Sequence, residues 1–324
     1  MKDLNNELKH YQKADISVVE YNNLLDRFIK YIDATEATVQ TYKRSLKQFL
    51  KYLADNRISE PKREDILNFK KYLKNIGRKP TTIQNYIIVV RLFFKWTSQE
   101  NIYPNIADRV KGAKLDTTHK KDYLTSAQIK DVLKNIDTST LKGARDYAIV
   151  ALMVTTGLRT IEISRAKVGD IRNIGNTPVL YIQGKGKEEK NDYVKLPYQV
   201  IKAIGVYRNM LANEHEQLFV STSNNNKGKG LTTCSVSTIV KNAMKEAGYN
   251  SPRLTAHSLR HSTATLNLLN GGTLEETQQL LRHSKISTTM VYLHHLERIN
   301  NDSEKRIASS IFTAKEQLLS LIHI

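Results

Sequence analysis

The stretch AHSLRHS at residues 256–262 places His257, Arg260 and His261 on what the spacing predicts to be the first turns of a helix. The group admits three interpretations: a metal site, a phosphate site or a solvated face. His257 and His261 have the spacing of a zinc-binding helix, but that motif needs Glu after the first His, and here Ser258 stands there. Arginine offers a planar fork of donors that matches two phosphate oxygens, and an adjacent imidazole can donate a hydrogen bond or pass a proton. We therefore expect no metal and favour a phosphate site.

The segment TTGLRTIEI at 155–163 is the second candidate for phosphate chemistry. Gly157 is predicted to end one helix and Arg159 to begin the next, where unpaired N–H groups and the helix dipole favour an anion. Glu162 lies one turn further on and can orient a guanidinium. The alternative is that Arg159 and Glu162 form only a surface ion pair.

Two further segments contain side chains that could move a proton or attack a phosphorus atom. GKGK at 184–187 lies in a predicted β-turn, where glycine lets a lysine approach a ligand closely; a solvated hairpin tip is the alternative. LLRHSKISTTMVYLHH at 280–295 places His283 nine residues before Tyr292. A phenol with a pKa of about 10 is a poor nucleophile unless neighbouring cations stabilise its charge. As one of 16 tyrosines, Tyr292 could also be an ordinary core aromatic.

The composition favours a protein that binds a polyanion. The 324 residues include 50 Lys and Arg against 32 Asp and Glu, a net charge of +18, and so basic a chain usually binds nucleic acid. No apolar run approaches the roughly 18–20 residues of a spanning helix, and the N-terminal segment lacks the apolar core of a signal peptide. Cys234 is the only cysteine, which excludes an internal disulfide and a cysteine-rich zinc cluster. We predict a cytoplasmic protein without a membrane partner.

The pattern of apolar residues predicts a mainly α protein with a small antiparallel β-sheet and two domains. Apolar residues at helical spacing predict four amphipathic helices, and short β-rich runs at 179–183 and 192–197 bracket the lysine-containing turn. The predicted parts are a flexible lead-in, a helical domain, a basic linker, a second domain and a tail helix, at residues 1–17, 18–111, 112–122, 123–300 and 301–324.

Cations interleave with the apolar positions of the first domain and recur in the linker. A solvated surface explains any single one of them, but their number, with few acids nearby, favours a face that follows DNA phosphates. We predict DNA contacts for Lys43, Arg44, Lys47, Arg78, Lys79, Lys111, Lys120, Lys121 and Arg282.

The chain resembles the tyrosine recombinase family, which includes phage integrases and Xer-type site-specific recombinases. Four motifs carry the resemblance, in this order along the chain: TGLRTIEI, GKGK, HSLRHS and LLRHSKISTTMVY. The resemblance covers about residues 18–300. It implies an N-terminal helical core-binding domain of SAM-like fold and a C-terminal catalytic domain that together clamp double-stranded DNA. Arg282 stands where this family often has glycine.

The resemblance implies a role for each residue that would contact the scissile phosphate. Arg159 and Arg260 would clamp its non-bridging oxygens, and His283 would donate a hydrogen bond to it. Lys185 would be the general acid for the departing 5′-oxygen, although Lys187 lies in the same turn and is an alternative.

The resemblance likewise assigns the nucleophile. Tyr292 would attack phosphorus and form a 3′-phosphotyrosyl link, His257 would assist proton movement, and Glu162 and His261 would support these side chains. The family uses no metal or cofactor and acts on recombination sites as a homo-tetramer on two DNA duplexes, with the tail helix as a candidate for docking on a neighbouring subunit. A DNA-binding regulator on the same fold without catalysis and a type IB topoisomerase-like DNA-relaxing enzyme are the alternatives.

Overall fold

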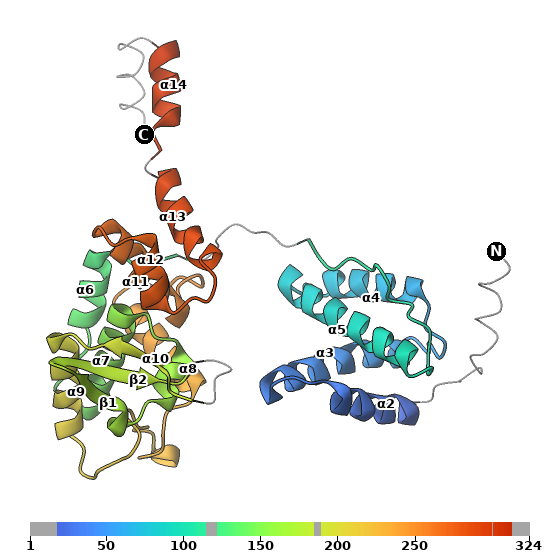
Figure 1. Cartoon of the computed structure of the whole chain (residues 1–324), viewed down its shortest axis with the longest axis horizontal. Coiled ribbons are helices and arrows are strands. Elements are labelled where there is room, and N and C mark those ends of the chain that lie inside the picture. The colour runs from blue at the N-terminus through green and yellow to red at the C-terminus, as the bar shows by residue number, and fades with distance from the viewer. Residues whose placement is uncertain (1–17, 115–121, 185–188, 300, 313–324) are drawn as a thin grey trace. The chain divides into compact units, whose positions relative to one another are not determined.

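The chain forms two compact units, Met1–Thr118 and His119–Ile324, and the division falls inside the predicted linker 112–122. The structure is a computed structural model that describes residues 18–114, 122–184, 189–299 and 301–312 (Figure 1). Helices predominate, with one small antiparallel sheet, so the predicted fold class is confirmed. In the described part of the chain, no helix is both long and apolar enough to cross a membrane.

The first unit contains the four amphipathic helices that the apolar spacing predicts. Pro80 occupies the first turn of the last helix, where its missing N–H costs nothing. Aromatic rings pack against one another in the core; the ring centroids of Phe49 and Phe69 lie 5.1 Å apart, and Phe28 meets Phe93 edge to face at 5.4 Å. The helices are α2 (Val18–Tyr31), α3 (Glu36–Asp55), α4 (Arg63–Asn75) and α5 (Pro80–Gln99).

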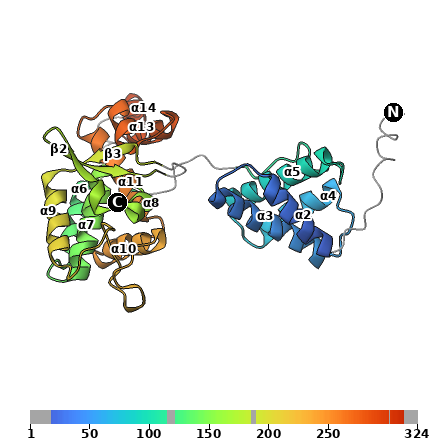
Figure 2. The same cartoon turned by 60° about the horizontal axis from the view of Figure 1, so that its bottom comes forward.

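The second unit is built around α7, which packs against α6, α9, α10 and α11 (Figures 1 and 2). The predicted capping box before α6 is present: Thr125 N donates to Gln128 Oε1 at 2.9 Å, and Gln128 N donates to Thr125 Oγ1 at 3.3 Å. The helices are α6 (Ser126–Lys134), α7 (Leu141–Thr156), α8 (Thr160–Arg165), α9 (Tyr198–Asn209), α10 (Thr233–Glu246), α11 (Ala256–Leu269), α12 (Leu274–Leu281), α13 (Ser287–Ile299) and α14 (Ser303–Ile311).

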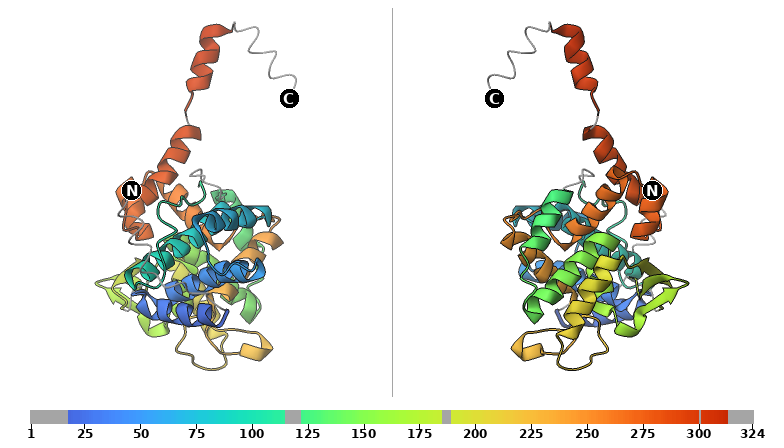
Figure 3. Two further views of the ribbon diagram at one scale, coloured as in Figure 1. Left: turned by 90° about the vertical axis from the view of Figure 1, so that its right-hand side faces the viewer. Right: turned by 90° about the vertical axis from the view of Figure 1, so that its left-hand side faces the viewer.

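The sheet lies at the margin of the second unit, as Figure 3 shows, and has the strand order β1-β2-β3. Its strands are β1 (Ile171–Ile174), β2 (Thr177–Ile182) and β3 (Asp192–Lys195), all antiparallel. The β-rich runs predicted β2 and β3 but not β1. Strand β1 has no buried residue, so it lacks the apolar alternation by which strands are recognised.

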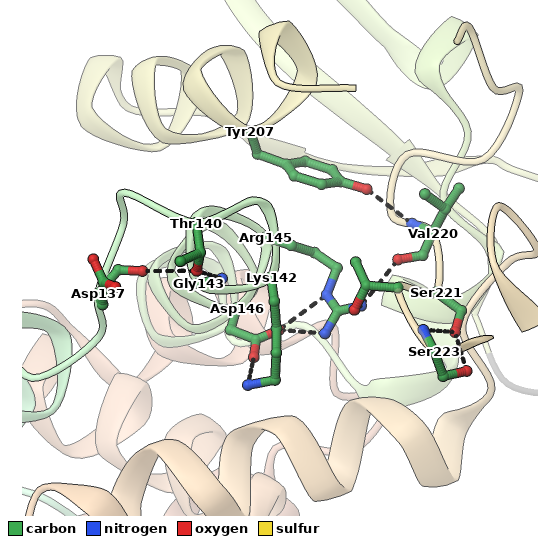
Figure 4. A network of polar contacts seen from close by, with 11 residues as sticks. Asp137, Thr140, Lys142, Gly143, Arg145, Asp146, Tyr207, Val220, Ser221 and Ser223 are labelled. Carbon is green, nitrogen blue, oxygen red and sulfur yellow. Dashed lines mark hydrogen bonds and ion pairs between the residues drawn. The ribbon is translucent and has the colours of Figure 1, made fainter. Parts of the chain in front are cut away.

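A buried polar network ties α7 to α9 and to the segment around Val220 (Figure 4). Arg145 Nη2 and Nε donate to Asp146 Oδ1 at 2.7 and 2.9 Å, and its Nη1 donates to Val220 O at 3.1 Å. Val220 N donates in turn to the hydroxyl of Tyr207 at 3.0 Å. Because the buried charges are paired and hydrogen-bonded, the network can hold α7 in place without leaving an isolated ion.

Gly157 forms the sharp turn between α7 and α8, as predicted. It has a φ of 63° and donates its N–H to Met153 O at 2.9 Å. A Cβ at this position would lie 2.6 Å from Leu281 Cδ2 on α12. The absence of a side chain therefore allows both the left-handed turn and the close approach of α12.

We expect Gly157→Ala to lose about 1–3 kcal/mol of unfolding free energy, because it combines a left-handed backbone with a steric clash. Urea denaturation measures this loss. The matched control is Gly205→Ala in α9, where an added Cβ meets nothing within 4 Å and φ is not positive. That variant should gain about 0.5–1 kcal/mol from helix propensity, and equal changes in the two variants would contradict the account.

Candidate active site

One cavity of about 330 Å³ brings together side chains from segments far apart in the sequence. Helix α11, which carries His257, Arg260 and His261 in its first turns, packs against α7, α12 and α13. Five of the six residues predicted to be catalytic line this cavity. Its lining residues are Arg159, His257, Arg260, His261, His283, Thr288, Val291 and Tyr292.

Arg260 is the buried cation of this cavity, with only 1% of its surface exposed. Its Nη1 donates to Gly157 O and its Nη2 to Leu281 O, so it joins the α7–α8 turn to the end of α12. A guanidinium has five N–H donors, and these two bonds leave three for a ligand. Burial, followed by the repulsion of Arg159 and Arg282, lowers the pKa of Arg260 to about 9, so it keeps its charge at neutral pH.

Arg159 is held at the start of α8 by Glu162. The Glu162 carboxylate accepts the backbone N–H of Arg159 at 2.7 Å and its Nη1 at 3.0 Å. The Glu162 side chain is 1% exposed, whereas that of Arg159 is 31% exposed. The pair is therefore not the surface ion pair considered from the sequence: a buried carboxylate orients a guanidinium that reaches the cavity.

His283 lies two residues after the end of α12 and is fixed by a residue that the sequence did not single out. Its Nδ1 lies 2.9 Å from the hydroxyl oxygen of Thr289, which is fully buried. Burial, followed by the repulsion of Arg260 and Arg159, lowers the pKa of His283 to about 4. The imidazole is therefore neutral at physiological pH. A threonine six residues after a histidine carries no recognisable pattern, so this partner could not be read from the sequence.

The depressed pKa of His283 predicts a loss of stability in acid. Between its ordinary value of 6.5 and about 4, the unfolded chain binds a proton that the folded His283 does not. The unfolding free energy should therefore fall as pH falls through this window. We expect wild type to lose more stability than His283→Gln between about pH 7 and about pH 5 in urea denaturation.

His294→Gln is the control for that comparison, because it removes an exposed histidine of α13 and leaves His283 in place. It should retain the acid-dependent loss of wild type. If His283→Gln shows the same loss as His294→Gln, the protonation of His283 is not linked to folding.

Tyr292 is 7% exposed and lies among the cavity's imidazoles. The centroid of its ring is 5.2 Å from that of His261 and 6.5 Å from the nearly parallel ring of His283. His261 in turn meets His257 edge to face at 4.8 Å. Burial raises the pKa of Tyr292, whereas Arg260 and Arg159 act to lower it. Tyr292 thus packs as a core aromatic and also lines the same cavity as the two guanidiniums.

The predicted general acids Lys185 and Lys187 lie outside the described residues, as do Lys120 and Lys121. Gly184, the residue before Lys185, lines a neighbouring cavity of about 660 Å³ together with Arg159 and His283. Arg165 Nη1 donates to Gly184 O at 3.3 Å. The start of the lysine-containing turn therefore lies beside the candidate site.

Apart from Arg282, the other cations predicted to bind DNA lie on the first unit. Lys43, Arg44 and Lys47 belong to α3, and Lys43 Nζ is 3.6 Å from Asp26 Oδ1. The remaining three are exposed and lie outside the helix interiors: Arg78, Lys79 and Lys111. Contacts of these residues with DNA stay predictions.

Arg282 has a different environment from the one expected. Its side chain is 10% exposed and lies 3.1 Å from Glu162 Oε2. Arg282 is therefore not a surface cation, and its contact with DNA stays a prediction. No group of three or more His, Cys, Asp or Glu in the described ranges is arranged to hold a metal ion.

Comparisons with known proteins match both units. The model of the phage integrase family matches residues 122–298, and that of the phage integrase N-terminal SAM-like domain matches residues 25–101. Tyrosine recombinase XerD of Listeria innocua is 29% identical over 287 residues, which cover 84% of this chain and 94% of the relative.

Two solved structures show the same fold at 19% identity. The XerH site-specific recombinase bound to palindromic difH substrate gives a TM-score of 0.74 and covers 91% of this chain and 99% of that chain. A lambda integrase tetramer bound to a Holliday junction gives a TM-score of 0.67, covering 84% of this chain and 76% of that chain. Since the family match extends over more than half of its residues, this chain belongs to the phage integrase family of tyrosine recombinases.

Proposed function

We propose that Tyr292 is the nucleophile with which this site-specific tyrosine recombinase cleaves DNA. The observation that carries the proposal is the single cavity lined by Tyr292, Arg159, Arg260, His257 and His283. The phenolic oxygen attacks the scissile phosphorus, a Tyr–O–P bond forms, and the bond from phosphorus to the 5′-oxygen breaks. The products are a 3′-phosphotyrosyl link and a free 5′-hydroxyl, and a 5′-hydroxyl of another strand reverses the step to rejoin the DNA.

The charges around the cavity match those that develop in this reaction. Arg159 and Arg282 each form an ion pair with the Glu162 carboxylate, and Arg260 lines the same cavity as Arg159. A phosphodiester carries one negative charge and gains a second as the phenolic oxygen attacks. Fixed cations in a largely buried pocket stabilise such a transition state, because they need no reorganisation when the charge appears.

The proton movements follow from the protonation states. The phenol of Tyr292 is protonated at neutral pH because its pKa is raised, so its proton must leave during attack, and His257 assists that movement. Neutral His283 can accept the Thr289 hydroxyl at Nδ1 and keep its proton on Nε2, which donates to a phosphate oxygen. Lys185, or Lys187 beside it, gives a proton to the departing 5′-oxygen.

A nicked DNA substrate tests this proposal. Duplexes that bind the protein are first selected from a random pool, and a nick near the cleavage point lets the short 5′-hydroxyl fragment diffuse away. We expect an SDS-resistant protein–DNA complex, linked through the DNA 3′-phosphate, that forms equally well with EDTA. A requirement for a divalent metal, or a link to a 5′-phosphate, would contradict the mechanism.

The nicked-DNA assay and a plasmid-relaxation assay together separate the two alternatives. A regulator without catalysis would bind the selected DNA but form no covalent complex with any nicked site. A type IB topoisomerase-like enzyme would relax supercoiled plasmid that lacks the selected site. We expect relaxation only of plasmids that contain the site, because the sequence relative is a tyrosine recombinase and the similar XerH structure is that of a site-specific recombinase.

We further propose that a homo-tetramer acts on two DNA duplexes in the cytoplasm, with residues 18–111 as a core-binding domain. The lambda integrase tetramer on a Holliday junction supports this arrangement. Helix α14 has no buried residue, and Ile307, Ile311 and Phe312 are each more than half exposed. Such an apolar surface suits docking on a neighbouring subunit.

A further inference from the structure

Arg282 occupies its position at several costs to folding. It ends α12 with a φ of 55°, a left-handed conformation that favours glycine. Its charged side chain is 10% exposed, and its buried Nε has no hydrogen-bond partner among the residues that the structure describes. Strained backbone and unsatisfied buried groups collect at functional sites, where the surrounding structure maintains them.

The guanidinium of Arg282 reaches two elements that position the cavity. Its Nη2 donates to Glu162 Oε2 at 3.1 Å, and its Nη1 donates to Leu280 O at 2.7 Å. Longer contacts of 3.4 and 3.5 Å join it to the carbonyl oxygens of Thr156 and Gly157. The side chain therefore connects the end of α12 to the α7–α8 turn.

Each of these two elements contains or adjoins a residue that positions a side chain of the cavity. Glu162 orients Arg159 through two hydrogen bonds, so a cation that fixes the Glu162 carboxylate also fixes the Arg159 guanidinium. His283 is the residue after Arg282 in the chain, so the left-handed turn at Arg282 determines the position of the His283 backbone and thereby of its imidazole. Arg260 joins the same two segments through Gly157 O and Leu281 O.

We propose that Arg282 is a positioning residue for strand cleavage, acting on Arg159 through Glu162 and on His283 through the backbone. This inference rests on the proposed roles of Arg159 and His283. In this role Arg282 holds the side chains that would contact the phosphate. Misplacement of reacting groups by about 1 Å can cost about 100-fold in rate.

The experiment compares Arg282→Gly with wild type on the nicked substrate at saturating DNA. Glycine relieves the left-handed backbone, so the variant should fold, and its melting temperature and DNA affinity are measured beside the rate. We expect single-turnover cleavage to fall by about 10- to 100-fold while DNA affinity stays within about threefold. A wild-type rate in the folded variant would overturn the proposal.

Arg57→Gly is the matched control. Arg57 has a φ of 54° and is exposed in the first unit, so the change removes the same charge and the same backbone strain at a residue that does not line the cavity. The Arg57→Gly variant should cleave the nicked substrate at the wild-type rate. Arg282→Lys keeps a charge but not the planar fork, and we expect a rate roughly fivefold below wild type. A wild-type rate for Arg282→Lys would also overturn the proposal.

A double-mutant comparison tests the route through Glu162. In the Glu162→Gln background the carboxylate is absent, so Arg282→Gly should lower the rate by much less than in wild type. Equal losses in both backgrounds would overturn this route. If wild type itself forms no adduct, the proposed function fails instead, so the two failures are distinguishable.

Discussion

The Tyr292→Phe variant is expected to form no covalent complex with nicked DNA, because it lacks the only oxygen that the mechanism uses as a nucleophile. Phenylalanine keeps the ring that packs against Ala264 and Leu281, so the fold and the binding of DNA should persist. The expected loss is at least about 10⁴-fold, as for removal of a nucleophile in other covalent enzymes. SDS gel electrophoresis of radiolabelled nicked DNA measures it.

Tyr207→Phe is the matched control for this variant. Tyr207 is likewise a buried tyrosine, and its hydroxyl accepts a hydrogen bond from Val220 N, but it does not line the cavity. Loss of the Tyr207 hydroxyl should lower the free energy of unfolding by about 1 kcal/mol and leave adduct formation unchanged. Adduct formation by Tyr292→Phe at a rate near that of Tyr207→Phe would show that another residue attacks.

Replacement of Arg260 by glutamine is expected to have the second-largest effect. Glutamine cannot supply the charge that faces the developing negative oxygens, and loss of one such donor costs about 10²–10³ in rate. The variant should also be less stable, because Gly157 O and Leu281 O each lose the hydrogen bond from Arg260. Single-turnover cleavage, at a temperature where thermal melting shows the variant folded, separates these two losses.

Arg208→Gln controls for the structural part of that effect. Arg208 likewise joins two backbone carbonyls, Gln217 O and His215 O, each at 3.1 Å, but lies outside the cavity. We expect lower stability with normal cleavage per folded molecule. If Arg260→Gln and Arg208→Gln cleave equally well, Arg260 has only a structural role.

Much of the fold could be predicted because local rules determine it. Helical spacing predicted the four helices of the first unit, and the sequence Thr125 to Gln128 predicted a cap that the structure contains. Gly157 was predicted to end a helix because left-handed caps favour glycine. Strand β1 was missed because it has no buried face of its own. Its four residues form a strand through their pairing with β2.

The site could be predicted only in part, because some of its contacts join distant residues. The motifs around Arg159, Arg260 and Tyr292 identified five residues that share one cavity. The burial of Glu162 and its bond to Arg282, 120 residues away, depend on tertiary packing that no local pattern reveals. For the same reason the hydrogen bonds of Arg282 to Glu162 and Leu280 could not be predicted from the sequence.

Mass spectrometry of the trapped complex tests the central claim most directly. After digestion of the DNA and the protein, the mechanism predicts a nucleotide remnant on the peptide that contains Tyr292, joined through the phenolic oxygen. The same remnant on any other residue, or an unmodified Tyr292 in a purified adduct, would contradict it.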